Sequence, residues 1–159
     1  MQSHRLTKIV VSSGVGKLRS NVKFDESILP KIVADFSTIV GQKPAPRGAK
    51  KSIATFKTRT GDVVGLVATL RGKRMNDFLS RLVNVALPRV RDFRGIDPKN
   101  FDSRGNLSIG IKEHTIFPEI NPEKTPTTFG LQVTFTTDTK TKEEGIALCR
   151  KLGIPLKKA

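Results

Sequence analysis

The sequence contains few residues that could cross-link the chain or bind a metal ion. It has one cysteine, Cys149, so no intrachain disulfide can form, and it has only two histidines, His4 and His114. These three residues lie far apart and do not have the spacing of a zinc site. Cys149 lies on the apolar side of an amphipathic segment, where we expect a buried and unreactive thiol. His114 follows a strand-like segment and is expected at the surface. We expect no metal ion and no other cofactor.

Long apolar runs are also missing. No stretch approaches the roughly 18 apolar residues that a membrane-spanning helix needs. The first residues, MQSHRLTK, do not resemble a signal peptide. A single cysteine suits a reducing compartment. These absences predict a soluble cytoplasmic protein that has no membrane partner.

Acidic residues are scarce. The chain of 159 residues has 14 Asp and Glu against 29 Lys and Arg, a formal net charge of +15. Such an excess predicts attraction to polyanions, above all nucleic acid. The charge is uneven, because residues 42–112 hold 16 Lys and Arg against 5 Asp and Glu, whereas residues 113–138 hold one Lys and four acids. We expect one surface to meet a polyanion and another to face a different partner.

No group of residues has the arrangement of a catalytic site. Asp92, Asp97 and Asp102 are close in sequence and could hold Mg²⁺ or transfer protons in an RNA-processing enzyme. They alternate with basic residues, so we expect local ion pairing to order this loop instead. The fragment SSGVGKL resembles a phosphate-binding loop, but Leu18 replaces the hydroxyl that binds Mg²⁺. The alternative is a tight turn with positive φ at its glycines. We expect a protein that is not an enzyme.

The apolar pattern predicts alternating strands and helices. β-Branched and apolar runs predict strands at residues 6–12, 62–70, 106–112 and 131–137, with extended chain at 44–46. Apolar residues at three-to-four-residue spacing predict helices at 25–40, 74–87 and 141–152. Asp25 or Ser27 should cap the first helix and Gly41 should end it. We predict one α+β domain over residues 1–159, a two-layer arrangement with an antiparallel-rich sheet and helices packed on one face. The other face would be free for a partner.

Basic residues are concentrated in loops that also contain glycine. The stretch KKSIATFKTRTGD at residues 50–62 is one example, and the others are Arg47-Gly48, Arg71-Gly72, Arg94-Gly95 and Arg104-Gly105. Glycine lets backbone N–H groups approach phosphates, and the planar arginine fork matches them. Phe56, Phe93 and Phe101 lie among these loops and would either stack on bases or pack in the core. These residues predict a non-catalytic protein that binds nucleic acid, and they do not distinguish DNA from RNA.

Four blocks of the sequence resemble a known family. They are GQKPAPRGAKKSIATFKTRTGDVVG, ATLRGKRMNDFLSRLVNVALPRVRDFRG, FDSRGNLSIGIKEH and IFPEI. From about residue 6 to residue 155 the chain closely resembles large-ribosomal-subunit protein family number five. The resemblance implies a structural constituent of the large subunit that binds 5S ribosomal RNA and helps attach it to the central protuberance. The alternative is an RNA-binding regulatory module that acts outside the ribosome.

The resemblance also implies roles for particular positions. The family's 5S ribosomal RNA contacts fall here on Ser12, Gln42, Lys43, Thr69 and Arg71. Its loop toward the peptidyl-site transfer RNA falls on Lys57, Thr58, Arg59, Thr60 and Gly61. Its segment facing a small-subunit head protein falls on Pro118, Glu119, Asn121 and Glu123. Further implied partners are 23S ribosomal RNA and the neighbouring proteins of the central protuberance.

Two features depart from the family pattern. The family usually has asparagine where this chain has Ser12, so we expect a shorter contact there. The family also begins with a helical segment before the first strand, whereas this sequence starts almost at the strand. We expect the contacts of that helix to be absent or replaced.

Overall fold

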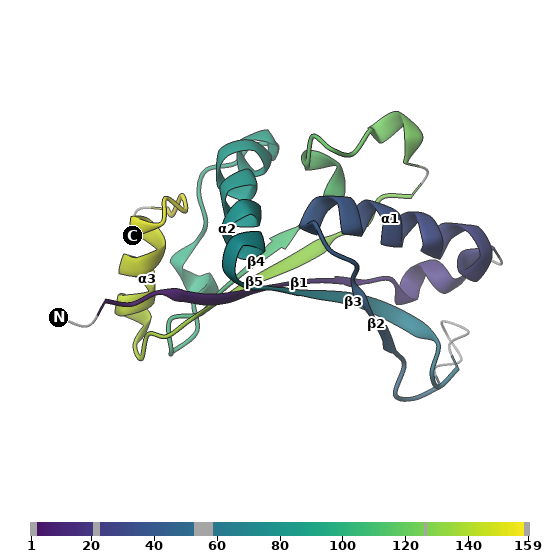
Figure 1. The fold of residues 1–159 in the computed structure, drawn as a ribbon, viewed down its shortest axis with the longest axis horizontal. Coiled ribbons are helices and arrows are strands. Elements are labelled where there is room, and N and C mark those ends of the chain that lie inside the picture. Colours follow the sequence, from purple (N-terminus) through teal and green to yellow (C-terminus); the bar gives the residue numbers. More distant parts are fainter. Residues whose placement is uncertain (1–2, 21–22, 53–58, 126, 158–159) are drawn as a thin grey trace.

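The centre of the fold is an antiparallel β-sheet. A computed structural model describes residues 3–20, 23–52, 59–125 and 127–157, and these residues form a five-stranded sheet in the order β2-β3-β1-β5-β4 (Figure 1). The strands are β1 (Leu6–Gly14), β2 (Ala45–Gly48), β3 (Val63–Leu70), β4 (Leu107–Ile111) and β5 (Leu131–Thr137). All four pairings are antiparallel. β1 is the middle strand, so the first strand in the sequence joins the two halves of the sheet.

Three α-helices accompany the sheet within the described residues. They are α1 (Leu29–Val40), α2 (Gly72–Arg81) and α3 (Lys142–Lys151). Figure 1 shows α1 and α2 on the same side of the sheet and α3 at the end where the N-terminus lies. The predicted α+β class is confirmed, as is the predicted order of strands and helices. None of the described helices is long and apolar enough to cross a membrane.

The helix ends follow the sequence only in part. Gly41 ends α1 with φ of 80°, the left-handed conformation that glycine favours, as predicted. Thr141 caps α3, because its hydroxyl accepts the Glu144 N–H at 3.3 Å. The predicted caps of the first helix are wrong. A π-helical turn (Phe24–Ile28) precedes α1, with Lys23 at its cap position, and the Ser27 hydroxyl donates to the Lys23 carbonyl at 3.1 Å instead.

The second helix changes type before its proline. α2 passes into a π-helical turn (Leu82–Ala86) and then into a 3-10 turn (Leu87–Arg89) that contains Pro88. Proline lacks the N–H that a continuing α-helix needs, and its ring crowds the carbonyl one turn earlier. The helix predicted to end at residue 87 therefore passes into one wider helical turn and then one tighter turn before it stops.

The SSGVGKL fragment does not form the predicted turn. β1 continues to Gly14, which pairs with Gly65 of β3, and a 3-10 helix (Gly16–Ser20) follows. The glycines with positive φ are at other positions, so neither Gly14 nor Gly16 has the left-handed backbone that we expected. The pairing with β3 keeps Gly14 extended and explains the difference.

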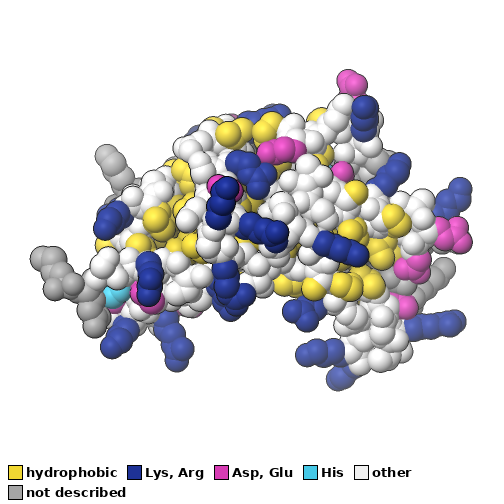
Figure 2. Space-filling model, viewed as in Figure 1, with side chains coloured by type: hydrophobic (Ala, Val, Ile, Leu, Met, Phe, Trp, Pro, Cys, Tyr) yellow, Lys and Arg dark blue, Asp and Glu magenta, His cyan; other side chains and the backbone are white. Residues whose placement is uncertain are grey.

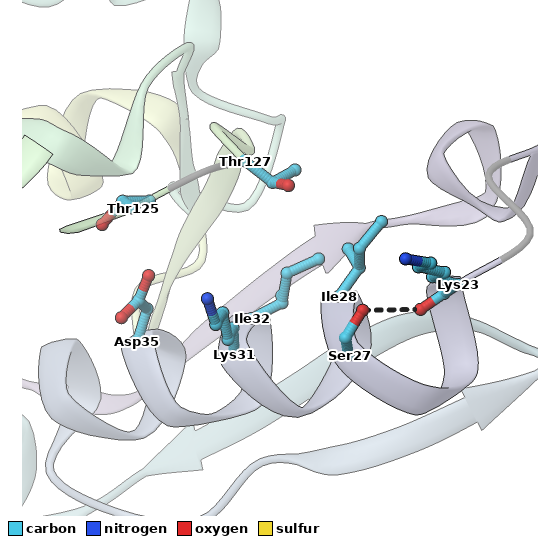
Figure 3. A pocket seen from close by; sticks show the side chains of 8 residues that line it. All are labelled: Lys23, Ser27, Ile28, Lys31, Ile32, Asp35, Thr125 and Thr127. Carbon is cyan, nitrogen blue, oxygen red and sulfur yellow. Dashed lines mark hydrogen bonds between the residues drawn. The ribbon is translucent and has the colours of Figure 1, made fainter. Parts of the chain in front are cut away.

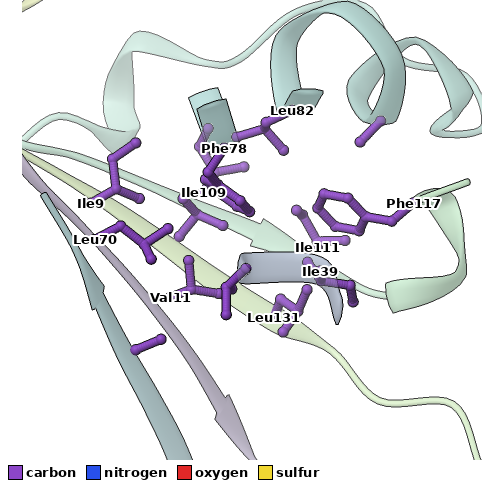
Figure 4. Close-up of a cluster of buried hydrophobic side chains, with 14 of the residues drawn as sticks. Ile9, Val11, Ile39, Leu70, Phe78, Leu82, Ile109, Ile111, Phe117 and Leu131 are labelled. Carbon is purple, nitrogen blue, oxygen red and sulfur yellow. The ribbon is translucent and has the colours of Figure 1, made fainter. Parts of the chain in front are cut away.

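The hydrophobic core lies between the sheet and the helices α1 and α2. Figure 4 shows Ile9 and Val11 of β1 beneath Phe78 of α2, with Phe117 from the β4–β5 connection beside them. The Phe78 and Phe117 rings stack with centroids 6.0 Å apart. All four side chains are fully buried. Removing a ring from such a site costs about 3–5 kcal/mol, so these residues hold the helices on this face.

The opposite face of the sheet has no helix over it in Figure 1. Side chains alternate along a strand, so the residues between the core residues point to this side. We call them the open face: Lys8, Val10, Ser12, Gly65, Val67, Thr69, Ser108, Gly110, Gln132, Thr134 and Thr136. Each is half-buried or exposed. The five described strands contain no Asp or Glu, so the open face has no negative side chain of its own.

His114 is fully buried, and the expectation of a surface histidine is wrong. Its Nδ1 accepts the Phe129 N–H at 3.3 Å, so the proton of the neutral ring lies on Nε2, which donates to Asp35 Oδ2 at 3.3 Å. The ring also stacks on Phe129, with centroids 3.9 Å apart. Asp35 belongs to α1, so His114 ties the β4–β5 connection to that helix. Burial lowers the pKa of His114, although the bond to Asp35 acts in the opposite direction.

The lowered pKa predicts a pH-dependent stability. The unfolded chain binds a proton at His114 below about pH 6.5, whereas the folded protein resists this proton. The stabilising contribution should be complete above pH 6.5 and should be lost as the pH falls through the lower pKa of the folded state. Urea unfolding between pH 5 and pH 8 measures how the free energy of unfolding changes with pH. His114→Asn keeps an acceptor for the Phe129 N–H and should flatten this pH dependence; an unchanged pH dependence in that variant would contradict the assignment.

Candidate nucleic-acid interface

Three of the predicted RNA contacts meet at one edge of the open face. Gly41 turns the chain sharply after α1, and the next residue, Gln42, reaches the end of β3. Its Nε2 donates to the Thr69 carbonyl oxygen at 3.1 Å, and its Oε1 accepts Arg74 Nη1 at 3.2 Å. The two bonds fix the amide of Gln42 between β3 and α2. Arg71 lies between these elements and is exposed.

The other two predicted contacts lie close to this edge. Ser12 lies on the open face opposite Val67, and Thr69 is opposite Val10, so Ser12 and Thr69 are diagonal neighbours on adjacent strands. Such neighbours are about 7–8 Å apart. Lys43 follows Gln42 and is exposed. The structure therefore brings together all five positions that the resemblance had implied for 5S ribosomal RNA.

Basic residues surround this edge. Arg47 lies on β2 opposite Gly65, and Lys73 and Arg74 are exposed in the first turn of α2. Figure 2 shows Lys and Arg side chains over the whole visible surface, including the β2–β3 end, with fewer Asp and Glu side chains. Hydroxyl and amide groups on the open face, next to cations at its edge, match the sugar and phosphate groups of RNA.

The base of the β2–β3 loop is well ordered by hydrogen bonds. The Arg59 N–H donates to Asp62 Oδ2 at 2.9 Å, and the Thr60 N–H donates to the Ser52 hydroxyl at 3.2 Å. Gly61 has φ of 91°, and its N–H donates to the Ala49 carbonyl at 2.9 Å. The first two side chains of the predicted loop contact, Lys57 and Thr58, lie outside the described residues. Arg59, Thr60 and Gly61 are exposed.

The predicted protein-contacting residues lie together on the β4–β5 connection. Pro118, Glu119, Asn121 and Glu123 are all exposed. Asn121 Oδ1 accepts the Glu123 N–H at 3.0 Å and so caps a short 3-10 turn. Glu119 forms an ion pair with Arg81 at 3.3 Å, but both side chains are about one-third exposed, so solvent screens the pair strongly. The acidic groups thus remain accessible to a partner.

A groove of about 360 Å³ separates α1 from this connection. Figure 3 shows Lys31 and Ile32 of α1 on one side, with Thr125 and Thr127 on the other. Asp35 lines the same groove but is bonded to His114. The groove therefore contains two lysines, hydroxyls and one engaged carboxylate, a set that has no nucleophile paired with a base. It lies where α1 faces the β4–β5 connection, which carries the acidic residues.

Two of the candidate catalytic carboxylates, Asp97 and Asp102, accept hydrogen bonds from backbone N–H groups. Asp97 Oδ1 accepts the Lys99 N–H, and Asp102 Oδ1 accepts the N–H groups of Arg104 and Asn106, all at 2.9 Å. Slight burial would raise the pKa of Asp102, but these N–H groups outweigh it and lower the pKa. The hydrogen bonds that Asp97 and Asp102 accept from the backbone order this loop, and in the part of the chain that the structure describes these carboxylates form none of the predicted ion pairs. The described residues contain no group of three or more His, Cys, Asp or Glu that could hold a metal ion.

The thiol and the candidate stacking rings belong to the interior. Burial raises the pKa of Cys149 to about 11, so the thiol is protonated and unreactive near neutral pH, as predicted. Phe101 is buried in the core and Phe93 packs against it, so neither stands on the surface as a platform for bases. Phe56 lies outside the described residues.

Sequence reasoning missed the β5 part of the open face. Gln132, Thr134 and Thr136 alternate with buried residues and extend the open face beyond β1. The signal was present as the alternation in LQVTFTT, which shows three polar residues on one side of a strand. The sequence did not show that this strand pairs with β1.

Comparison with known proteins gives a consistent result. Residues 1–59 match the family model described as Ribosomal protein L5, and residues 63–156 match the model that describes the C-terminus of the same ribosomal family. The large ribosomal subunit protein uL5 of Desulfatibacillum aliphaticivorans is 51% identical over 158 residues, which cover 99% of this chain and 86% of that protein. The protein of the same name from Halothermothrix orenii is 47% identical over 151 residues, covering 95% and 82%. That from Trichodesmium erythraeum is 47% identical over 156 residues, covering 98% and 84%.

The similarity therefore extends over both halves of the chain and over every element of the sheet. It confirms the family that the four sequence blocks predicted, and with it the expectation of a protein that is not an enzyme. The chain belongs to the ribosomal protein uL5 family, whose members are structural constituents of the large ribosomal subunit.

Proposed function

We propose that residues 1–159 act as one unit that binds 5S ribosomal RNA through the open face and the edge formed by Gln42, Thr69 and Arg71. The observation that carries this proposal is the one-sided sheet, whose uncovered face lacks carboxylates and borders a cluster of cations. In the large subunit this binding would help attach 5S ribosomal RNA to the central protuberance. 23S ribosomal RNA and neighbouring proteins are the further partners in that setting.

The chemistry of the open face favours RNA over other polyanions. Ser12, Thr69 and Thr134 offer hydroxyl groups that both donate and accept, as a ribose 2′-OH requires. Val10 and Val67 are half-buried and give apolar contact to sugars and bases. Arg71 adds a planar donor for phosphate. A purely electrostatic surface would not need this mixture of hydroxyl and apolar groups.

Two other segments are proposed to contact other partners. The β2–β3 loop, with Arg59, Thr60 and Gly61 at its described end, would reach the peptidyl-site transfer RNA. The exposed acidic residues of the β4–β5 connection, among them Glu119 and Glu123, would face a basic head protein of the small subunit. The separate locations of the three segments support separate partners.

Arg71 gives the sharpest test of the RNA contact. Its side chain makes no cap hydrogen bond at the start of α2, so Arg71→Ala should leave the fold intact. We expect the variant to bind 5S ribosomal RNA about 1–3 kcal/mol more weakly and to reduce the slope of log K against log salt by about 1. Filter binding across salt concentrations measures both quantities. Arg150→Ala, an exposed cation on α3, is the control and should change neither; equal losses in both variants would argue against a localised site.

The loop should be separable from 5S ribosomal RNA binding. A Lys57→Ala/Arg59→Ala variant is expected to bind 5S ribosomal RNA within about twofold of the unchanged protein, because the resemblance assigns both positions to the transfer RNA loop and Arg59 joins the base of that loop through its backbone N–H, which the substitution keeps. Ribosomes that carry this variant should bind peptidyl-site transfer RNA more weakly. A variant that lost 5S ribosomal RNA binding as strongly as Arg71→Ala would show that this division of roles is wrong.

A further inference from the structure

A shallow groove of about 420 Å³ lies at one end of the open face. It is lined by Ser12 and Gly14 of β1, Gly110 of β4, Lys112, Gly130 and Gln132 of β5. The predicted contacts at Gln42, Thr69 and Arg71 lie on the other side of β1, so most of this groove is a separate part of the face. Its volume falls in the range of sites for small organic groups.

The groove exists because strands part and side chains are missing there. Ser12, Gln132 and Gly110 form one row across β1, β5 and β4, and the ladder between β1 and β5 ends at this row while β1 continues to Gly14. A Cβ atom added to Gly14 or Gly110 would have nothing within 4 Å, so the space above both glycines is empty. The row spans two strand spacings, about 10 Å.

The floor of the groove is held in place from below. The Ser13 hydroxyl donates to the Gly130 carbonyl oxygen at 2.7 Å, and Ser13 is only 5% exposed. A Cβ on Gly130 would meet the Ile111 carbonyl oxygen at 3.1 Å, so the chain also packs closely against β4 here. These contacts keep the parted strand ends at a fixed distance, and the groove is preformed.

The polar groups of the groove suit a flat, uncharged ring with donors and acceptors on its edge. Gln132 is exposed, and among the described residues its side-chain amide has no hydrogen-bonding partner. An amide offers a donor and an acceptor side by side, the arrangement that pairs with a base edge. Ser12, opposite Gln132 on β1, adds a hydroxyl at that end of the row. Among the described residues that line the groove, Lys112 is the single cation, too little for a cluster of phosphates but enough for the phosphate of one nucleotide.

We propose that this groove receives one unpaired nucleobase of the bound RNA, with Gln132 on the base edge, the glycine backbone beneath the ring and Lys112 on the adjoining phosphate. This inference rests on the proposed binding of 5S ribosomal RNA to the open face. A base inside a helix cannot enter the groove, because its faces are stacked and its Watson–Crick edge is paired, whereas a base in a loop or bulge can turn outward. The groove thus selects RNA that presents a flexible, single-stranded nucleotide at this position.

Filling the groove tests the proposal. Gly110 has no positive φ and has free space above it, and valine favours strands, so Gly110→Val should fold normally. We expect it to bind 5S ribosomal RNA about tenfold more weakly or worse. Base-specific chemical probing of the complex should show one unpaired nucleotide that is protected by the unchanged protein and reactive with Gly110→Val, with the rest of the footprint retained. Ser108→Val adds the same side chain two residues away on the same strand and face. Ser108 belongs to the open face, so the overall affinity of this variant can fall, but the nucleotide in the groove should stay protected.

The outcomes separate this inference from the proposed function. If the unchanged protein prefers 5S ribosomal RNA to an unrelated RNA but Gly110→Val gives the same affinity and footprint, the groove proposal is overturned and the proposed function stands. Loss of that nucleotide's protection in Ser108→Val as well as in Gly110→Val would also overturn it, because the effect would belong to the whole face. If the unchanged protein shows no preference for 5S ribosomal RNA, both proposals fall.

Discussion

The structure depends on a sheet that is buried on one side only. The alternation along β1 sends Ile9 and Val11 to the helices and leaves Val10 and Ser12 on the other side. A shift of one residue in the pairing of this strand would exchange the two sets and expose the core. Because β1 is the middle strand, its register also fixes that of β3 and β5. The register of β1 therefore determines both which residues form the core and which residues lie on the open face.

One-sided burial also explains how the two kinds of charge are kept apart. The strands contribute no carboxylate, so the open face stays neutral or positive, and the basic residues gather at its edges. The acidic residues of the β4–β5 connection lie on the helix side, where His114 and Phe117 attach that connection to α1 and the core. We infer that the protein presents different surfaces to RNA and to protein because they lie on opposite sides of one sheet.

The sequence was sufficient for the parts of the fold that local patterns determine. The β5 strand was predicted at its observed position, since alternation along a strand is a local signal. The burial of His114 was not predictable, because its partners Asp35 and Phe129 are distant in sequence. The extended backbone at Gly14 depends on its pairing with Gly65, which is likewise not local.

The candidate interface also has a part that could be predicted from the sequence and a part that could not. The resemblance to a family supplied Gln42, Thr69 and Arg71, and the structure shows how they come to lie together, through the bonds of Gln42 to β3 and Arg74. Neither residue type nor spacing could reveal the groove at Gly110 and Gln132, because it arises where two strands part after their last pair. Strand register is a property of the folded sheet, so sites that depend on it appear only in the structure.

The central claim, that RNA occupies the uncovered face of the sheet, has a direct test in the valine methyl groups. Val10 and Val67 are half-buried on the open face, whereas Val85 is 39% exposed beyond α2 on the helix side. Methyl NMR of the protein with and without 5S ribosomal RNA compares the two sides in one experiment. If RNA occupies the uncovered face, the Val10 and Val67 signals should shift and show contacts to RNA protons while Val85 is unchanged. Shifts confined to Val85, with Val10 and Val67 unaffected, would contradict it.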